Sequence, residues 1–177
     1  DLVMRMAALN PGESEIIFYY AGHGLPDEIT KEAYLIPVDV SGSNLDAAIH
    51  IENKVYKKFA ESGAKRITIF LDACFSGGAR ESGLMAARSV KVKPKPNQIT
   101  GNMVVFTASS GDQSALPHKE KEHGMFTYFL LKKMQDTKGE FTYGDMKDYL
   151  SKEVRYTSLL INEKNQDPSV NVSIEVE

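Results

Sequence analysis

Residues 66–78 read RITIFLDACFSGG, an apolar run that changes abruptly into a polar segment rich in glycine. The apolar part, residues 66–71, is continuous rather than alternating, which is typical of a strand buried on both faces of a parallel sheet. Residues 16–20 and 103–107 have the same character. These three runs predict the central strands of the fold.

Helical periodicity separates the predicted strands. Apolar residues recur at spacings of three and four in three segments, namely residues 51–60, 126–134 and 142–154. Thr142 predicts the N-cap of the third helix, because its hydroxyl can accept a hydrogen bond from the first turn. Residues 33–37 predict a short strand or an extended connection, and residues 169–176 predict a terminal strand. Strands that alternate with helices indicate an α/β sandwich with a mainly parallel sheet.

The composition narrows the class of protein. The chain has 177 residues, of which 42% are hydrophobic and 25% charged, and these values are typical of one globular domain that spans residues 1–177. A net charge of -3 argues against nucleic acid as the main partner. No apolar run approaches the roughly 20 residues of a membrane span, and the first residues lack a signal-peptide pattern. We therefore expect neither a nucleic-acid nor a membrane partner, and a cytoplasmic location is favoured.

One segment breaks the alternation of strands and helices. Residues 79–102 show little apolar periodicity, and a loop of that length is uncommon inside a compact domain. The basic residues of its first part are Arg80, Arg88, Lys91, Lys93 and Lys95. We expect an exposed, flexible, basic linker here, which serves either as a solvated connection or as a site of self-cleavage.

The chemistry is predicted at the carboxyl ends of two strands, where function collects in parallel sheets. The first strand runs into His23, which glycines flank, and the second runs into Cys74, the only cysteine of the chain. A thiolate is a strong nucleophile and a histidine can take up the proton, so the pair suits nucleophilic catalysis. The backbone N–H groups of Gly24 and Cys74 are candidate donors to the developing oxyanion. A single cysteine excludes an internal disulfide and a metal site built from several cysteines.

At these residues the sequence resembles the caspase-like cysteine peptidases of clan CD, peptidase family C14. The histidine motif is FYYAGHG at residues 18–24, and the nucleophile motif is DACFSG at residues 72–77. The similarity is closest to the branch of metacaspases, paracaspases and bacterial caspase-like proteins. It implies a three-layer sandwich with helices on both faces of the sheet, with His23 as the base and Cys74 as the nucleophile.

Two aspartates are candidate substrate-binding residues. Asp72 lies two residues before Cys74, so that both side chains point to one face of the strand. The resemblance implies that Asp72 lines a pocket for Arg or Lys before the scissile bond, and that Asp112 is a second acidic pocket residue. The alternatives are that Asp72 caps the turn that follows and that Asp112 is an ordinary turn residue. A carboxylate beside the thiolate disfavours ionisation of the cysteine, so we also expect a compensating group, such as a bound cation.

The sequence departs from the family in its first residues. The strand, helix and strand that precede the histidine strand in the family are missing from this chain, so we expect that they were removed or that a separate N-terminal chain supplies them. No cofactor is expected from the residues themselves. Some metacaspases need calcium, for which Asp27, Glu28 and Glu32 are loose candidates.

The resemblance also gives the basic linker a role, because the family is often processed between its large and small subunits. Cleavage is expected after Arg88, with Arg80 and Lys91 as further sites, whereas prolines follow Lys93 and Lys95. The sequence therefore predicts a cysteine endopeptidase that cuts peptides or proteins after Arg or Lys and processes its own linker. The alternatives are a catalytically silent caspase-fold module that binds partners and an enzyme that acts on small acyl substrates through the same dyad.

Overall fold

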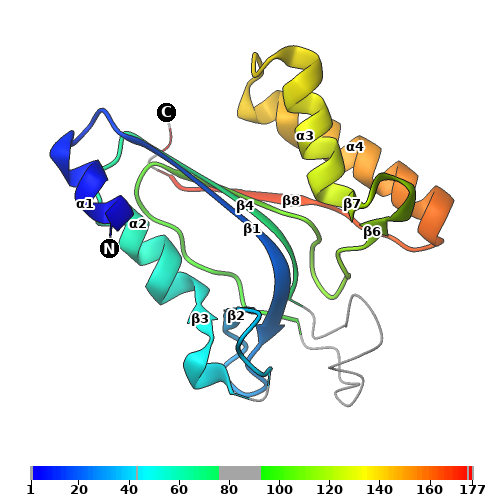
Figure 1. Ribbon diagram of the computed structural model, residues 1–177, viewed down its shortest axis with the longest axis horizontal. Coiled ribbons are helices and arrows are strands. Elements are labelled where there is room, and N and C mark those ends of the chain that lie inside the picture. Colours follow the sequence, from blue (N-terminus) through cyan, green and yellow to red (C-terminus); the bar gives the residue numbers. More distant parts are fainter. Residues whose placement is uncertain (1, 43, 76–92, 175, 177) are drawn as a thin grey trace.

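A six-stranded sheet forms the centre of the part of the chain that the structure describes, and helices cover both of its faces (Figure 1). The structure is a computed structural model that describes residues 2–42, 44–75, 93–174 and 176. The strand order is β3-β2-β1-β4-β5-β8. These strands are β1 (Glu15–Pro26), β2 (Ala33–Ile36), β3 (Ile49–His50), β4 (Arg66–Cys74), β5 (Met103–Thr107) and β8 (Ser169–Val172). The helices are α1 (Leu2–Leu9), α2 (Lys57–Ala60), α3 (Met125–Thr137) and α4 (Tyr143–Asn162).

The three central strands run parallel, as the sequence predicts. β1 pairs with β4 and β4 pairs with β5 in parallel ladders, whereas β2 and β8 add to the sheet in antiparallel orientation. Parallel neighbours need a crossover connection, and the segment between β1 and β4 supplies one that contains α2. The carboxyl ends of β1 and β4 therefore meet at one edge of the sheet.

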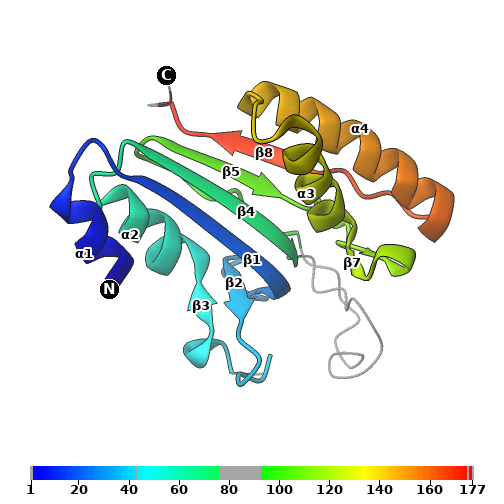
Figure 2. The ribbon, with the colours of Figure 1, turned by 45° about the horizontal axis from the view of Figure 1, so that its top comes forward.

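Two hydrophobic cores lie on opposite faces of the sheet (Figure 2). On one face, Ile69 and Leu71 of β4 pack in a cluster with residues of α1 and α2. On the other face, Phe70 and Cys74 of the same strand pack in a cluster with residues of α3 and α4. Because successive side chains of β4 enter opposite cores, its sequence is a continuous apolar run. The α/β sandwich of three layers is confirmed.

Strands β1 and β4 are longer than the sequence predicts. Their parallel pairing continues as far as His23 opposite Cys74, and β2 then pairs with residues 23–26 of β1. Gly24 therefore lies inside a strand and not in a turn. A Cβ atom at this position would lie 2.8 Å from the carbonyl oxygen of Cys74 and 2.5 Å from the ring of Phe75. The glycine permits this close packing, and the predicted catalytic pair lies on regular strands.

Helix α4 begins at its predicted cap. The hydroxyl of Thr142 accepts the N–H of Asp145 at 3.0 Å, and the carboxylate of Asp145 accepts the N–H of Thr142 at 2.9 Å, which is a capping box. The predicted helix over residues 51–60 begins instead with a π-helical turn over residues 52–56. None of the helices in the described ranges is long and apolar enough to cross a membrane.

The basic linker is described only in part. Its predicted cleavage sites Arg80, Arg88 and Lys91 lie outside the described residues. Residues 93–100 form no helix or strand and lead into β5. The terminal strand is shorter than predicted and ends at Val172, because the chain then turns and the N–H of Val176 donates to the carbonyl of Ser173.

Candidate active site

His23 and Cys74 lie opposite each other in the parallel ladder of β1 and β4. Side chains alternate between faces along a strand, and aligned residues of neighbouring strands share a face. His23 and Cys74 therefore point to the same face, the one on which α3 and α4 lie. Neighbouring strands are about 4.8 Å apart, so the side chains of an aligned pair can reach each other. The structure thus brings the two predicted residues together at the carboxyl end of the sheet.

The backbone of His23 is held while its side chain is exposed. The hydroxyl of Tyr20 lies 2.9 Å from the carbonyl oxygen of His23 and 3.0 Å from that of Ile36 in β2. This ring therefore ties the carboxyl end of β1 to the neighbouring strand. An exposed imidazole on a fixed backbone can turn toward a neighbour or a substrate, which suits a group that accepts and returns a proton.

The side chain of Cys74 is buried, with Cys74 only 4% exposed. Its Sγ accepts the backbone N–H of Ala115 at 2.9 Å and lies 3.4 Å from the carbonyl oxygen of the same residue. An N–H donor stabilises a thiolate, whereas an S–H group that donates to a carbonyl stabilises the thiol. A thiol satisfies both contacts, and the N–H contact is the one that an ionised sulfur keeps.

Asp72 is completely buried and lies against the first turn of α3. Its Oδ2 accepts the hydroxyl of Thr127 at 2.5 Å and the backbone N–H of the same residue at 3.3 Å. The N-cap residue of α3 is Gly124, which has no side chain to cap the helix. Asp72 takes this role from β4, and the helix N-terminus favours its negative charge. These contacts give weight to the interpretation of Asp72 as a cap, although the capped helix lies 55 residues away and not in the following turn.

A directed chain of hydrogen bonds connects Asp72 to β1. The hydroxyl of Tyr19 lies 2.7 Å from that of Thr127. Since Thr127 gives its only hydroxyl proton to the carboxylate of Asp72, the hydroxyl of Tyr19 must be the donor in this contact. Tyr19, Thr127 and Asp72 thus link β1, α3 and β4 on the face that His23 shares.

Asp112, the second predicted pocket residue, differs from Asp72 in its exposure. It is exposed and lies in the turn that follows β5. Its neighbour Gln113 is partly buried and bonds to Asp167. The structure therefore places one predicted pocket aspartate in the interior and the other on a surface turn.

The comparisons with known proteins agree with this architecture. A family model for the caspase domain matches residues 3–176. The chain belongs to the caspase family. No curated protein matches the sequence.

Two solved structures have folds similar to that of this chain. Caspase-1 from Spodoptera frugiperda has 11% sequence identity and a TM-score of 0.59, with 97% of this chain and 66% of that chain covered. A structural genomics target from Geobacter sulfurreducens has 14% identity and a TM-score of 0.59, with 97% and 72% covered. This caspase domain therefore spans just under two thirds of the length of the insect caspase.

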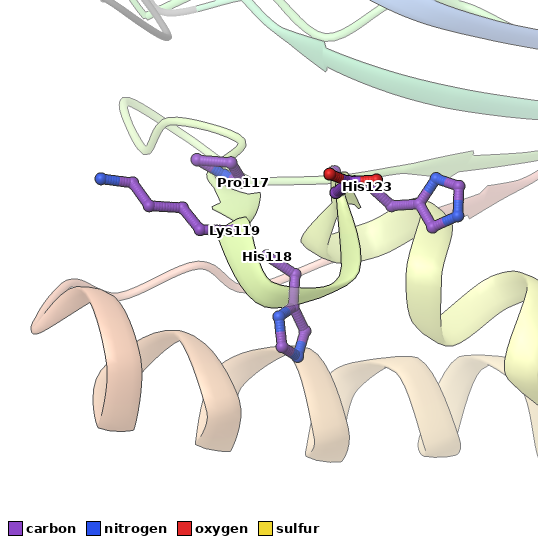
Figure 3. A pocket seen from close by; sticks show the side chains of 6 residues that line it. Pro117, His118, Lys119 and His123 are labelled. Atoms are coloured by element: carbon purple, nitrogen blue, oxygen red, sulfur yellow. The ribbon is translucent and has the colours of Figure 1, made fainter.

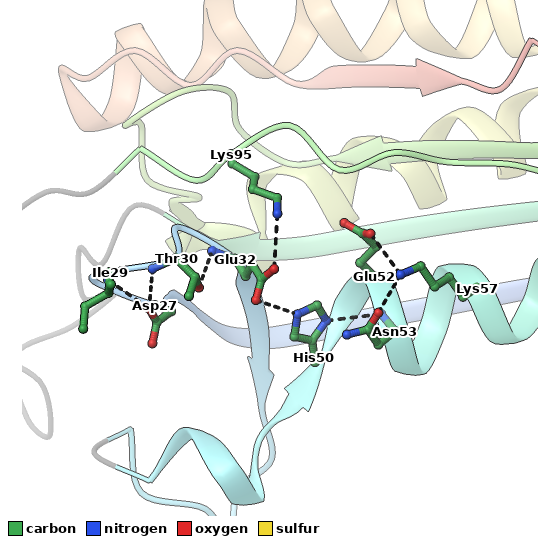
Figure 4. A network of polar contacts seen from close by, with 9 residues as sticks. All are labelled: Asp27, Ile29, Thr30, Glu32, His50, Glu52, Asn53, Lys57 and Lys95. Atoms are coloured by element: carbon green, nitrogen blue, oxygen red, sulfur yellow. Dashed lines mark hydrogen bonds and ion pairs between the residues drawn. The ribbon is translucent and has the colours of Figure 1, made fainter.

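The calcium candidates of this caspase domain make contacts within the protein. Asp27 Oδ1 accepts the N–H groups of Ile29 at 2.9 Å and Thr30 at 2.7 Å (Figure 4). These backbone hydrogen bonds, with that of Thr30 the larger cause, lower the pKa of the Asp27 carboxyl. Within the described ranges, no group of three or more His, Cys, Asp or Glu side chains is placed to hold a metal ion.

Glu32, another of the three calcium candidates, joins β3 to the described part of the linker. Its carboxylate lies 3.1 Å from Nε2 of His50 and 3.2 Å from Nζ of Lys95 (Figure 4). The hydrogen bond from His50, followed by that from Lys95, lowers the pKa of the Glu32 carboxyl. The N–H of Lys95 also donates to the carbonyl of Lys31 at 2.9 Å, so backbone and side chain both hold this point of the linker.

A small pocket of about 200 Å³ lies at the hairpin of β6 (Pro117–His118) and β7 (His123–Gly124) (Figure 3). His118 points toward α4 and packs edge-on against Tyr128, with the ring centroids 4.8 Å apart. Gly124 lines the pocket with its backbone, and a Cβ atom there would lie 2.0 Å from Oδ2 of Asp72. The hairpin is thus packed directly against the carboxylate at the candidate site.

Sequence reasoning missed Ala115 and Thr127, the residues that contact Cys74 and Asp72. Ala115 contributes only backbone atoms to its contact with the sulfur, so its side chain carries no signal of it. Thr127 lies in the first turn of a predicted helix, and that position was the only available sign of a capping contact. Both contacts join residues more than forty positions apart and depend on how the layers pack.

Proposed function

We propose that this caspase domain is a cysteine endopeptidase that cleaves peptide bonds after Arg or Lys, with Cys74 as nucleophile and His23 as general base. The register of the β1–β4 ladder carries the proposal, because it sets these residues side by side at the carboxyl end of a parallel sheet. Membership of the caspase family supports the reaction class.

In the proposed reaction, His23 takes the thiol proton and the Cys74 sulfur attacks the carbonyl carbon of the scissile bond. The backbone N–H groups of Gly24 and Cys74 are the proposed donors to the oxyanion of the tetrahedral intermediate. The imidazolium of His23 then protonates the leaving amine, and water hydrolyses the thioester with His23 again as base. The chemistry needs no metal ion, so we expect equal activity in calcium and in a calcium chelator.

The specificity of the proposed enzyme rests on Asp72, with Asp112 as a second acidic residue. A substrate guanidinium can pair with a carboxylate in a bidentate way that a lysine cannot reproduce. Asp72 is buried under Gly124 and bonded to Thr127, so a substrate cation reaches it only if the first turn of α3 shifts. Specificity and helix capping are therefore separate roles that one residue can hold, and they need separate measurements.

The test compares fluorogenic peptides with Arg, Lys, Asp or Ala before the scissile bond. We expect turnover of the Arg and Lys peptides and none with Cys74→Ala. Asp72→Asn keeps an oxygen that accepts from Thr127 but loses the charge, so kcat/KM for the Arg peptide should fall at least about tenfold with little loss of stability. A wild type that prefers Asp or Ala would contradict the specificity, and an active Cys74→Ala would contradict the nucleophile.

A catalytically silent module that binds partners is the second candidate, and the burial of Cys74 favours it. The sulfur of a buried cysteine must be uncovered before it can attack a substrate. Absence of turnover for every peptide, together with a Cys74 that iodoacetamide does not modify in the native protein, would favour this candidate over the peptidase.

Self-processing is part of the proposal for the active enzyme. The expected site is Arg88 in the linker, with Arg80 and Lys91 as further sites. The intact mass of purified wild type and of Cys74→Ala decides it, because only the wild type should be cut. Equal cleavage in both proteins would point to a contaminating protease, and an active wild type that stays whole would exclude self-processing.

A further inference from the structure

One buried side chain holds both ends of the loop that contacts the Cys74 sulfur. This loop, residues 108–116, follows β5 and contains Ala115. Gln166 lies after α4 and is completely buried. Its Nε2 donates to the carbonyl of Ala108 at 2.9 Å, and its Oε1 accepts the N–H of Leu116 at 2.8 Å. The amide of Gln166 therefore bridges the start and the end of the loop.

A second amide contact joins the middle of the same loop to the residue that follows Gln166. Nε2 of Gln113 donates to Oδ2 of Asp167 at 2.6 Å, and Oε1 of Gln113 accepts the N–H of Asp167 at 2.7 Å. The hydroxyl of Ser109 donates to the carbonyl of Gln113 at 3.2 Å. The loop is thus attached to residues 166–167 at three points along its length.

Ala115 lies between these attachments. Its neighbour Leu116 is held on both sides, since its N–H goes to Gln166 and its carbonyl accepts the N–H of Met125 at 2.8 Å. The N–H of Ala115 is in turn directed at the Cys74 sulfur at 2.9 Å. Hydrogen bonds of a buried network support one another, so loss of the Gln166 bridge should loosen the contact between Ala115 and the sulfur.

We propose that Gln166 is a positioning residue for the nucleophile, which acts by holding the Ala115 amide against the Cys74 sulfur. A backbone N–H that is fixed in advance stabilises the thiolate without a reorganisation of the loop. The inference rests on the proposed function in that it takes Cys74 as the reactive group. It adds that Gln166, which follows the C-terminal end of α4 in the chain, tunes the reactivity of that sulfur.

Among the described residues, the carboxylate of Asp72 and the imidazole of His23 share the face of the sheet with the sulfur, and both are independent of the bridge. The hydroxyl of Tyr19 lies on the same face and contacts Thr127. Asp72 precedes Cys74 on β4 and is held by Thr127 of α3. His23 faces Cys74 from β1, and its backbone is tied to β2 by Tyr20. Replacement of Gln166 should therefore change the loop contact and leave these two groups in place.

The test measures how alkylation of the only cysteine by iodoacetamide depends on pH, with intact mass as the readout. Gln166→Met has a similar volume and lacks both hydrogen bonds. We expect the midpoint of its pH–rate profile to shift upward by about half to one pH unit, the shift that corresponds to one net hydrogen bond to the sulfur. Gln113→Ala removes an outer attachment of the same loop and should shift the midpoint in the same direction by a smaller amount.

The matched control is Ser158→Ala. Ser158 of α4 is also completely buried, and its hydroxyl donates to the carbonyl of Lys164. The variant therefore disturbs the segment between α4 and Gln166, and the hydrogen bond that it removes does not involve residues 108–116. It should lower the melting temperature and leave the midpoint unchanged. An unshifted midpoint in a folded Gln166→Met, or an equal shift in Ser158→Ala, would overturn the proposal, and so would a native wild type that does not react. If Gln166→Met does not fold, Gln113→Ala tests the proposal in its place. An unshifted midpoint in Gln113→Ala would then overturn the proposal.

This readout is independent of peptide cleavage. A shifted midpoint in a protein that cleaves none of the peptides would support the positioning role and contradict the proposed peptidase. Cleavage of Arg peptides with an unshifted midpoint in Gln166→Met would support the proposed peptidase and contradict the positioning role of Gln166.

Discussion

The two strands that carry the candidate dyad differ in how their side chains are held. On the face shared with α3 and α4, Asp72 and Cys74 of β4 are 0% and 4% exposed, and each makes hydrogen bonds to a residue outside β4. On the same face of β1, Ile17 is 72% exposed and Tyr19 is 47% exposed. His23 is exposed as well. Cys74 is thus held by packing, whereas His23 is held by strand register.

This difference predicts opposite responses to substitution. Changes that remove a hydrogen bond around β4 should alter stability and reactivity together, because the same hydrogen bonds serve both. Changes of exposed side chains on β1 should alter activity with little effect on stability, because little of the folding free energy depends on exposed side chains. The following predictions test this division in order of decreasing expected effect.

His23→Ala should show the largest separation of activity from stability. We expect kcat/KM for the Arg peptide to fall by about a hundredfold or more, because general base catalysis by the imidazole is lost. The melting temperature should stay close to that of the wild type. The control is His123→Ala on β7, which is also exposed and should keep full activity. A marked loss of stability in His23→Ala would contradict the view that the side chain of His23 contributes little to packing.

Gly124→Ala should destabilise the β4 side, because its Cβ would lie 2.0 Å from Oδ2 of Asp72. We expect the free energy of unfolding in urea to fall by about 1–3 kcal/mol, the usual cost of overpacking. Gly144→Ala is the matched control in helix α4, where the nearest atom to the new Cβ is the Thr142 hydroxyl at 3.6 Å. That variant should be neutral or stabilised by up to about 1 kcal/mol. Equal behaviour of the two variants would show that Gly124 does not pack on the carboxylate.

Removal of a hydrogen bond at either end of the chain Tyr19–Thr127–Asp72 should lower the free energy of unfolding, by different amounts at the two ends. Thr127→Val takes a donor from the buried carboxylate and should lower the free energy of unfolding by about 1–3 kcal/mol. Tyr19→Phe removes a donor to Thr127 at a half-exposed position and should cost about 1 kcal/mol or less. Urea unfolding of both variants and of the double variant measures the coupling between them. A larger effect for Tyr19→Phe would contradict the view that the buried end of the chain carries most of its stabilisation.

The smallest effect concerns the ion pairs of Glu32, far from the covered face of β4. The folded-state pKa of this carboxyl is lowered by His50 and Lys95, so its contribution to stability is present above its unfolded-state pKa and is lost as the pH falls through the folded-state value. Glu32→Gln should therefore melt slightly below the wild type at pH 7. The difference should disappear at pH 3, and a difference that persists there would assign the effect to packing.

Much of this caspase domain is predictable from local sequence. Continuous apolar runs predict the three central parallel strands, because a strand between two cores needs apolar side chains on both faces. Thr142 predicts the start of α4, because a cap acts on the next turn of the same segment. The pairing of His23 with Cys74 at one sheet edge also follows from strand order and parallel direction.

Tertiary structure decided what surrounds those residues. Thr127 lies 55 residues from the aspartate that caps its helix, and Ala115 lies 41 residues from the sulfur that its N–H contacts. Periodicity and motifs report on residues within a few turns of one another, whereas these contacts depend on which loop and which helix end cover β4. The sequence by itself determined the strands, the capped helix and the candidate dyad. Only the packing of the layers determined that Asp72 holds a helix and that Gln166 holds the loop over Cys74, because those hydrogen bonds form between elements that packing alone brings together.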